Sequence, residues 1–463
     1  MSLPTPIGRQ REVLYLPARG HFVVLGTAGS GKTTLAILRS AYLADRNTEH
    51  HGPTLLVTFN VALVAYLNHL GDQSLRGVTV ENYHKFARGY LASRGRMRYQ
   101  AILEPDERLG LVEQAIKEVA GRYEAHPMFG SPQFLSEEIR WIEQHGFETV
   151  DEYMEAERVG RAGARIPRNL RPVVFEILGE YRKLRSDSGK LYDWDDLAHE
   201  ARLKMEGDTS AKRYKHIVID EGQDFSPEMI RSLAASVPDD GSLTFFGDVA
   251  QQIYGHRVSW RSAGLTVSKV WEFRENYRNT RQIARLGLSI SRMPYFRGLP
   301  DMVEPLSPTA DGPPPTIVRC PTHRNEIDLI LQQAIRAAKT QSVAILFRDR
   351  ADEDKISGRL PPGSIRLHRK MHTWQAGPGI RYGTYHSAKG LEFDVVLLPF
   401  LSADRLPDPT EVEEFGKADA AAQDGRLLYV AVTRAKTRIV MTYSGELTEL
   451  LPDRPELFER LEQ

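Results

Sequence analysis

The chain has 463 residues, 41% of them hydrophobic and 26% charged, a balance that predicts a soluble globular protein of about three domains. Basic and acidic residues number 61 each, and this zero net charge excludes a protein that is basic over its whole surface, although a local basic groove stays open. The single cysteine, Cys320, excludes an internal disulfide framework and a thiolate zinc cluster, and it fits a reducing cytoplasm. The sequence shows no leader peptide and no apolar stretch of membrane-spanning length, so we expect a cytoplasmic protein that does not contact a membrane.

Short apolar segments separated by helical stretches predict an α/β fold whose parallel strands are covered on both faces. The expected strands are 22–25, 55–57, 216–219, 243–246, 343–347, 395–398 and 439–441. Between 93 and 185 strand signals are lacking, and Leu109, Val112, Ile116 and Val119 recur at helical spacing, which predicts a helical region. The proline-rich segment 306–315 is expected to be an exposed connection.

A glycine-rich loop follows the first expected strand. It fits the pattern G-x-x-x-x-G-K-[ST] between a strand and a helix start, the context that a phosphate-binding loop needs. The expected nucleotide-binding residues are Gly26, Thr27, Ala28, Gly29, Ser30, Gly31, Lys32 and Thr33. In such a loop backbone N–H groups converge on phosphate oxygens, Lys32 reaches the β- and γ-phosphates, and the Thr33 hydroxyl ligates Mg²⁺. A chance glycine-rich turn is the alternative, and the flanking strand and helix argue against it.

Two carboxylates follow the expected strand 216–219. Asp220, at the strand tip, would hold the Mg²⁺ of a nucleotide, and Glu221 would activate the attacking water. Such a pair alone is also typical of a solvated acidic turn. Combined with the phosphate loop, it predicts an Mg²⁺-dependent nucleotide hydrolase, while a P-loop kinase stays open because the loop does not identify the phosphoryl acceptor.

The segment 220–224 resembles the D-E-x-Q-D signature of superfamily 1A helicases, the UvrD/Rep/PcrA group. Further segments resemble motifs of that group in the same order, namely Gln10, 58–60, 82–86, 193–197, 247–254, 276–278, 384–392 and 428–436. The resemblance implies two RecA-like P-loop motor domains with parallel sheets and a helical 1B insertion. The expected division is 1–92 with 186–270 for the ATP-binding domain 1A, 93–185 for 1B, and 271–463 for domain 2A. Because 349–383 is too short for the 2B insertion of this group, we expect a compact form without it.

The same resemblance implies roles for individual residues. The expected catalytic residues are Lys32, Glu221, Gln251, Arg278 and Arg434. Gln251 would orient water or sense the γ-phosphate, and the two arginines would stabilise charge on the leaving phosphoryl group. Gln10 would read adenine, Tyr277 would stack on it, and Glu392 would approach the ribose.

Contacts to DNA are also expected from the resemblance. The candidates are Phe59, Asn60, His84, Tyr254, Trp260 and His386. Aromatic rings stack on bases with little sequence preference, and the polar side chains would contact phosphates or bases. For the rings, and above all for Trp260, packing in the core is the alternative. An arginine series, Arg158, Arg161, Arg165, Arg168 and Arg171, is expected to be a solvated loop, with phosphate contact as the alternative.

These implications amount to an ATP-dependent 3′→5′ DNA helicase or translocase that uses ATP and Mg²⁺ on single-stranded DNA and single-strand/duplex junctions, with a role in DNA repair. The alternative is an ATP-dependent switch or motor subunit of a larger nuclease, antiphage or repair complex, with little unwinding alone. A stoichiometric protein partner would favour that alternative.

Overall fold

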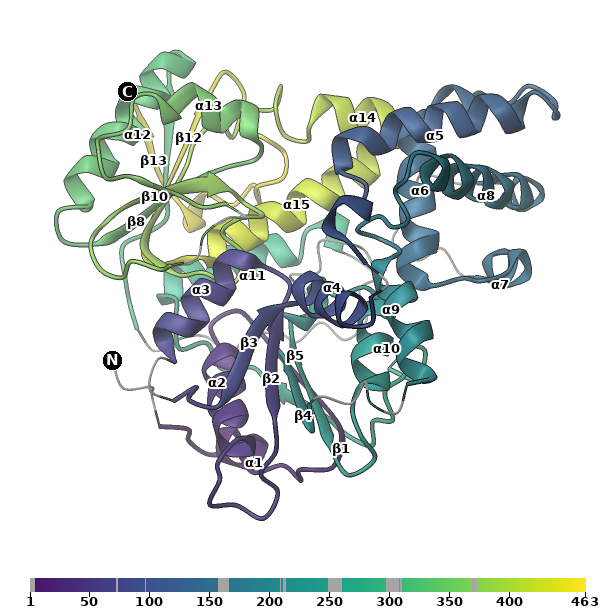
Figure 1. The fold of residues 1–463 in the computed structure, drawn as a ribbon. Coiled ribbons are helices and arrows are strands. Elements are labelled where there is room, and N and C mark those ends of the chain that lie inside the picture. The colour runs from purple at the N-terminus through teal and green to yellow at the C-terminus, as the bar shows by residue number, and fades with distance from the viewer. Residues whose placement is uncertain are drawn as a thin grey trace.

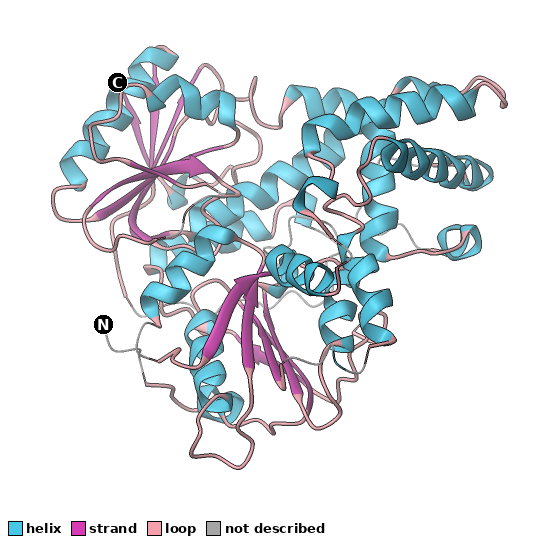
Figure 2. Ribbon diagram, in the orientation of Figure 1, coloured by secondary structure: helices cyan, strands magenta, loops and turns pink. Residues whose placement is uncertain are grey.

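The computed structural model describes residues 5–71, 74–95, 97–156, 166–208, 210, 214–248, 260–296, 308, 310–368, 371 and 373–463. Two parallel β-sheets with flanking helices make up most of it, and a group of helices projects beside them (Figures 1 and 2). The α/β architecture expected from the sequence is confirmed, because strands alternate with helices in both halves.

The first sheet has six parallel strands in the order β3-β2-β4-β5-β1-β6. They are β1 (Gly20–Gly26), β2 (Thr54–Thr58), β3 (Val78–Asn82), β4 (His216–Ile219), β5 (Ser242–Gly247) and β6 (Val270–Phe273). The accompanying helices are α1 (Arg9–Leu14), α2 (Lys32–Leu43), α3 (Val61–Leu70), α4 (Tyr83–Ser93), α9 (Leu197–Glu206) and α10 (Pro227–Ala235). Every residue of β2, β4 and β5 is buried, which explains why these strands are mostly apolar.

The helical group lies between α4 and α9 in the chain. It contains α5 (Pro105–Ala120), α6 (Pro132–His145), α7 (Val150–Glu155) and α8 (Arg171–Asp187). Val112, Ile116 and Val119 point into a core that these helices share, as their helical spacing predicts. Arg171 donates to the carbonyls of Tyr153, Met154 and Ala156 at the end of α7, so this arginine ties two helices together. Arg158, Arg161 and Arg165 lie outside the described residues.

The second sheet has seven parallel strands in the order β13-β7-β12-β11-β8-β10-β9. They are β7 (Thr316–Cys320), β8 (Ser342–Phe347), β9 (Ile365–Arg366), β10 (Gly379–Thr384), β11 (Phe393–Leu398), β12 (Ala435–Ser444) and β13 (Glu459–Glu462). Its helices are α11 (Arg281–Ser291), α12 (His323–Ala337), α13 (Arg350–Ser357), α14 (Pro409–Phe415) and α15 (Lys417–Thr433). The described chain between β8 and β10 forms α13 and β9, and the absence of a 2B domain stays a prediction.

The two sheets share one large apolar core. It includes Val24 and Leu35 from the first half and Leu346 and Leu428 from the second. The division of the chain into 1A, 1B and 2A stays a prediction; β6, at 270–273, pairs with β1 and so belongs to the first sheet. Within the described residues, the helices are too short or too polar to cross a membrane.

Candidate active site between the two sheets

The glycine-rich loop occupies the turn between β1 and α2. Gly29 and Gly31 have φ angles of +79° and +84°, a left-handed conformation that glycine adopts without the steric cost of a Cβ atom. Gly31 precedes the first residue of α2 and provides no side-chain cap, so the amides of the first helical turn are not capped by it. A helix start of this kind favours an anion.

Lys32 begins α2 and is buried, with 7% of its surface exposed. Its ammonium donates to the carbonyls of Gly26, at 2.8 Å, and Thr27, at 2.7 Å, and lies 4.0 Å from the Asp248 carboxylate. Burial lowers the pKa of Lys32, and the negative charge of Asp248 opposes this effect. The Lys32 ammonium is therefore held against the glycine-rich loop, where the resemblance places it.

Asp220 and Glu221 follow β4, beside the loop. Asp220 is 1% exposed, and both its carboxylate oxygens lack a hydrogen-bond partner. Burial and the charge of Glu221 raise the pKa of Asp220 to about 7, while the positive charge of Lys32 opposes the shift. Such a carboxylate suits a divalent cation, which would satisfy its oxygens.

Glu221 differs from its neighbour in backbone and electrostatics. It has φ +54°, the left-handed region, which costs a non-glycine residue energy and is often found at functional sites. Its carboxylate accepts a hydrogen bond of 2.5 Å from Gln223, whose own oxygen accepts from the Asp248 amide at 2.8 Å. Burial alone would raise the pKa of Glu221, but the charges of Arg434 and Lys32 outweigh burial and hold it below the ordinary value. The carboxylate is thus ionised at neutral pH, as a base must be.

The glycine-rich loop, Asp220 and Glu221 together form what we call the ATP corner. Its polar groups fit a nucleoside triphosphate with a divalent cation. The hydroxyls of Thr27 and Ser30 are buried in the loop without a hydrogen-bond partner, like the oxygens of Asp220. Buried polar atoms are normally paired, so unpaired ones gathered around a phosphate loop indicate a polar ligand.

Two arginines approach this corner from the second half of the chain. Arg278 is 12% exposed at its side chain and pairs with Glu392 at 2.5 Å. Arg434 is fully buried and donates to the carbonyls of Val430, at 3.0 Å, and Leu391, at 3.4 Å. Burial and the neighbouring Arg278 lower the pKa of Arg434 to about 10. The negative charge of Glu221 acts to raise the pKa of both arginines, so the two guanidiniums and this carboxylate interact electrostatically.

The segment before α11 is pressed against the phosphate loop. The Tyr277 amide donates to the Gly29 carbonyl at 2.9 Å, and the Thr27 amide donates to the Phe273 carbonyl at 3.1 Å. A Cβ at Gly29 would lie 2.3 Å from Asn276 Oδ1. The loop and the segment carrying Arg278 are thus in direct contact.

The expected adenosine contacts surround the same loop. Gln10 accepts from the Ile7 amide at 3.2 Å and donates to the Ser30 carbonyl at 3.4 Å. Tyr277 is 60% exposed, so its ring is accessible to a flat partner. Glu392 is engaged by Arg278 and, at 3.5 Å, by Lys436, so its approach to a ribose would compete with these pairs.

Further contacts join the two halves through the turn that follows β10. The Lys389 ammonium donates to the buried Asp224 carboxylate. Asn60 caps α3 by accepting from the Ala62 amide, and its side-chain amide donates to the carbonyls of Ser387, at 3.4 Å, and Lys389, at 3.1 Å. Asn60 thus lies in the interface between the halves. His386, in the turn after β10, is half-buried in this region.

Phe59 and His84 belong to a row of rings along the first half. The ring centroids of Phe59 and His84 are 5.4 Å apart, and those of His84 and Trp194 are 5.3 Å apart. Tyr99, which is 56% exposed, continues the row at 6.4 Å from Trp194. The guanidinium of Arg88 lies over both of these last rings, 5.0 Å from Tyr99 and 5.6 Å from Trp194. Trp194 belongs to the segment 193–197 that resembles a family motif, but the sequence did not predict it, Tyr99 or Arg88 as contacts of this row, since the three lie on separate segments.

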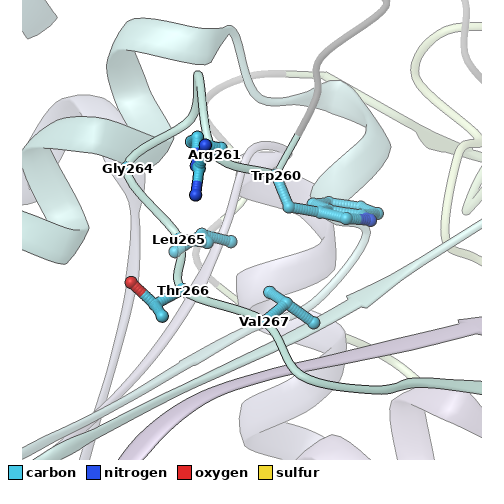
Figure 3. Close-up of a pocket in the computed structure, with 6 residues that line it drawn as sticks. All are labelled: Trp260, Arg261, Gly264, Leu265, Thr266 and Val267. Carbon is cyan, nitrogen blue, oxygen red and sulfur yellow. The ribbon is translucent and has the colours of Figure 1, made fainter.

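Trp260, like Phe59 and Trp194, is partly buried against the core of the first half. It packs edge-on against Phe245 of β5, with ring centroids 5.1 Å apart. A shallow pocket beside it is lined by Trp260, Arg261, Gly264, Leu265, Thr266 and Val267 (Figure 3). Part of this ring is therefore used for packing. Gln251 and Tyr254, also expected at the site, lie outside the described residues.

Comparison with known proteins identifies the family. The UvrD/REP helicase N-terminal domain matches residues 8–269, and the UvrD-like helicase C-terminal domain matches residues 364–446. DNA helicase IV of Escherichia coli is 23% identical over 92% of this chain and 66% of its own length. ATP-dependent DNA helicase UvrD2 of Mycobacterium tuberculosis is 23% identical over 94% of this chain and 78% of its own length, and a probable DNA helicase of Mycoplasma pneumoniae is 23% identical over 90% and 79%. The chain therefore spans about two thirds to four fifths of the length of these relatives. With more than half of its residues matched by the first of these domains, the chain belongs to the UvrD/Rep family of superfamily 1 helicases.

Proposed function

We propose that this chain is an ATP-dependent DNA helicase or translocase that moves 3′→5′ on single-stranded DNA. The observation that carries the proposal is the convergence of two halves on one corner. The phosphate loop, Asp220 and Glu221 come from the first half, and Arg278 and Arg434 approach from the second. A site divided in this way can link hydrolysis to relative movement of the halves.

The chemistry follows from the position of each group. Mg²⁺, held by the Thr33 hydroxyl and Asp220, would neutralise charge on the phosphates. Lys32 binds the terminal phosphates, and Glu221 accepts a proton as the water oxygen attacks the γ-phosphorus and the bond to ADP breaks. The guanidiniums of Arg278 and Arg434 stabilise the charge that develops on the phosphoryl oxygens.

Coupling to DNA follows from the contacts above the ATP corner. The turn that carries Lys389 contacts Asp224 and Asn60, so a cycle of ATP binding and product release that moves the two halves would change these contacts. The row from Phe59 through His84 and Trp194 to Tyr99 offers rings on which successive bases stack. Arg88, beside the last two rings, adds a positive charge for the backbone. A repeated cycle would draw the strand along this row.

Strand displacement with tailed duplexes tests this function. The substrates are duplexes of increasing length with a 3′ or a 5′ single-stranded tail, and the Glu221→Gln variant is the control, because it keeps the phosphate loop but lacks the base. Displacement from the 3′ tail by the wild type and none by the variant is expected. Preference for the 5′ tail would contradict the polarity. DNA-stimulated hydrolysis without displacement would contradict autonomous unwinding and favour a motor subunit of a larger nuclease, antiphage or repair complex.

A further inference from the structure

A tryptophan of the second half meets helix α3 of the first. The Trp374 ring lies edge-on to Tyr66, with centroids 5.2 Å apart at an interplanar angle of 75°, and 6.3 Å from Phe393 of β11. Trp374 precedes β10, in a loop whose next residues are exposed. A half-buried tryptophan in a mostly exposed loop indicates that the loop is anchored through this ring.

Arg381 holds the loop in place. It is buried in β10 and donates to the carbonyls of Gln375, Gly377, at 2.8 Å, and Gly379, at 3.2 Å. The same guanidinium lies 5.7 Å from the centroid of the Trp374 ring. One side chain therefore fixes both the loop backbone and the position of the tryptophan.

The N-cap of α3 and two residues of the helix face the second half and recur every three positions. The Asn60 side chain donates to carbonyls in the turn after β10, and the Tyr66 ring contacts Trp374. Leu63 packs closely against Gly390, because a Cβ atom on this glycine would lie only 2.7 Å from Leu63 Cδ2. Spacing of three places these side chains on one face of a helix. In Figure 1, α3 lies on the side of the first sheet that faces the second.

Trp374 links Tyr66 to the ion pair of the ATP corner, because its ring also lies 6.3 Å from Phe393, the residue that follows Glu392. Burial raises the pKa of Tyr66, the charge of Glu392 raises it further, and Arg278 and Arg434 oppose the shift. At the other end, α3 begins just after Phe59, the first ring of the proposed DNA row. Its ten residues span about 15 Å, so one rigid helix joins the row to the surroundings of Arg278.

We propose that Trp374 is a positioning residue that seats Tyr66 and α3 beside the Arg278–Glu392 pair, so that DNA bound at Phe59 and Asn60 accelerates ATP hydrolysis. The inference rests on the proposed function. Without the tryptophan ring, α3 keeps its place in the first half but loses the contact that aligns it with the second.

Steady-state hydrolysis with and without single-stranded DNA tests the inference in the full chain. Trp374→Ala is expected to reduce the stimulation of kcat by about threefold to tenfold, because an aromatic pair contributes roughly this factor. Hydrolysis without DNA and the KM for ATP should stay near the wild-type values. Trp374→Phe should restore the stimulation, and Tyr66→Ala should reproduce the loss without adding to it in the double variant.

The control is Trp271→Ala, which removes a partly buried tryptophan of β6 whose ring contacts Lys269, and thermal unfolding verifies that each variant is folded. Full stimulation in Trp374→Ala would overturn the inference. Equal losses in the Ala and Phe variants, or in Trp271→Ala, would also overturn it. A wild-type chain without DNA stimulation would overturn the proposed function itself.

Discussion

Gly29→Ala tests the contact between the phosphate loop and the segment carrying Arg278. At φ +79° an alanine costs about 1–2 kcal/mol of backbone strain. Its Cβ would lie 2.3 Å from Asn276 Oδ1 and 2.7 Å from Arg278 Cβ, so one segment must move.

Rotating the Asn276 side chain away from the new Cβ atom would break its hydrogen bonds. Its oxygen accepts from the amides of Arg278 and Asn279, both at 3.1 Å, and its amide donates to the Asn279 side chain at 2.9 Å. Losing three such bonds costs about 1.5–4.5 kcal/mol at about 0.5–1.5 kcal/mol each. Moving the segment that carries Arg278 avoids these costs but takes Arg278 out of position, and a loss of about 2.7 kcal/mol of transition-state stabilisation reduces kcat/KM for ATP by about a hundredfold, since each 1.36 kcal/mol is tenfold.

Gly77→Ala is the matched control, because Gly77 has φ +85° and a Cβ there meets nothing within 4 Å. Phosphate release under saturating single-stranded DNA is compared for both variants, together with their thermal unfolding. Gly77→Ala should lower stability while leaving turnover near wild type, and Gly29→Ala should lose turnover. Equal turnover in the two variants would refute the close packing of the two segments.

Three further predictions concern single side chains. Arg434→Lys should lower turnover by at least about tenfold while nucleotide binding, followed by fluorescence titration, changes less, because lysine lacks the planar paired donors; full turnover would show that charge alone suffices. Burial lowers the pKa of His216, which accepts from Ser242, to about 4, so the unfolded chain binds a proton between pH 6.5 and 4 that the native chain does not. Stability should therefore fall as the pH falls through this window, by up to about 3 kcal/mol, and His216→Gln should flatten the slope in urea unfolding; an unchanged slope would count against it. Arg108→Ala should lower the free energy of unfolding by about 3–5 kcal/mol in the same assay, since the buried Asp193 carboxylate, 2.5 Å from the Arg108 guanidinium, would lose this partner. A loss of stability below about 1 kcal/mol would contradict that role.

The sequence predicts the most apolar strands of both sheets and misses the others. Each expected strand lies within β1, β2, β4, β5, β8, β11 or β12, because buried parallel strands are continuous apolar runs. The strands β3, β6, β7, β9, β10 and β13 are not among those expected. Polar residues interrupt the half-buried β3 and the fully exposed β13, and tertiary pairing makes them strands.

The candidate site divides in the same way. The phosphate loop and the Asp220–Glu221 pair are each made of consecutive residues, so the sequence alone predicts which of these side chains lie together. The neighbours of Tyr66 and Trp194 come from distant segments, and their contacts appear only when the chain is folded. The left-handed backbone of Glu221 likewise has no signal in its residue type.

The most direct measurement is phosphate release from Mg-ATP by the isolated chain, with single-stranded DNA, duplex DNA, RNA or no nucleic acid, in the wild type and in Glu221→Gln. The account predicts low hydrolysis alone, strong stimulation by single-stranded DNA, and almost no turnover in the variant, although it still binds ATP. Hydrolysis that is indifferent to DNA, or wild-type turnover in Glu221→Gln, would contradict it.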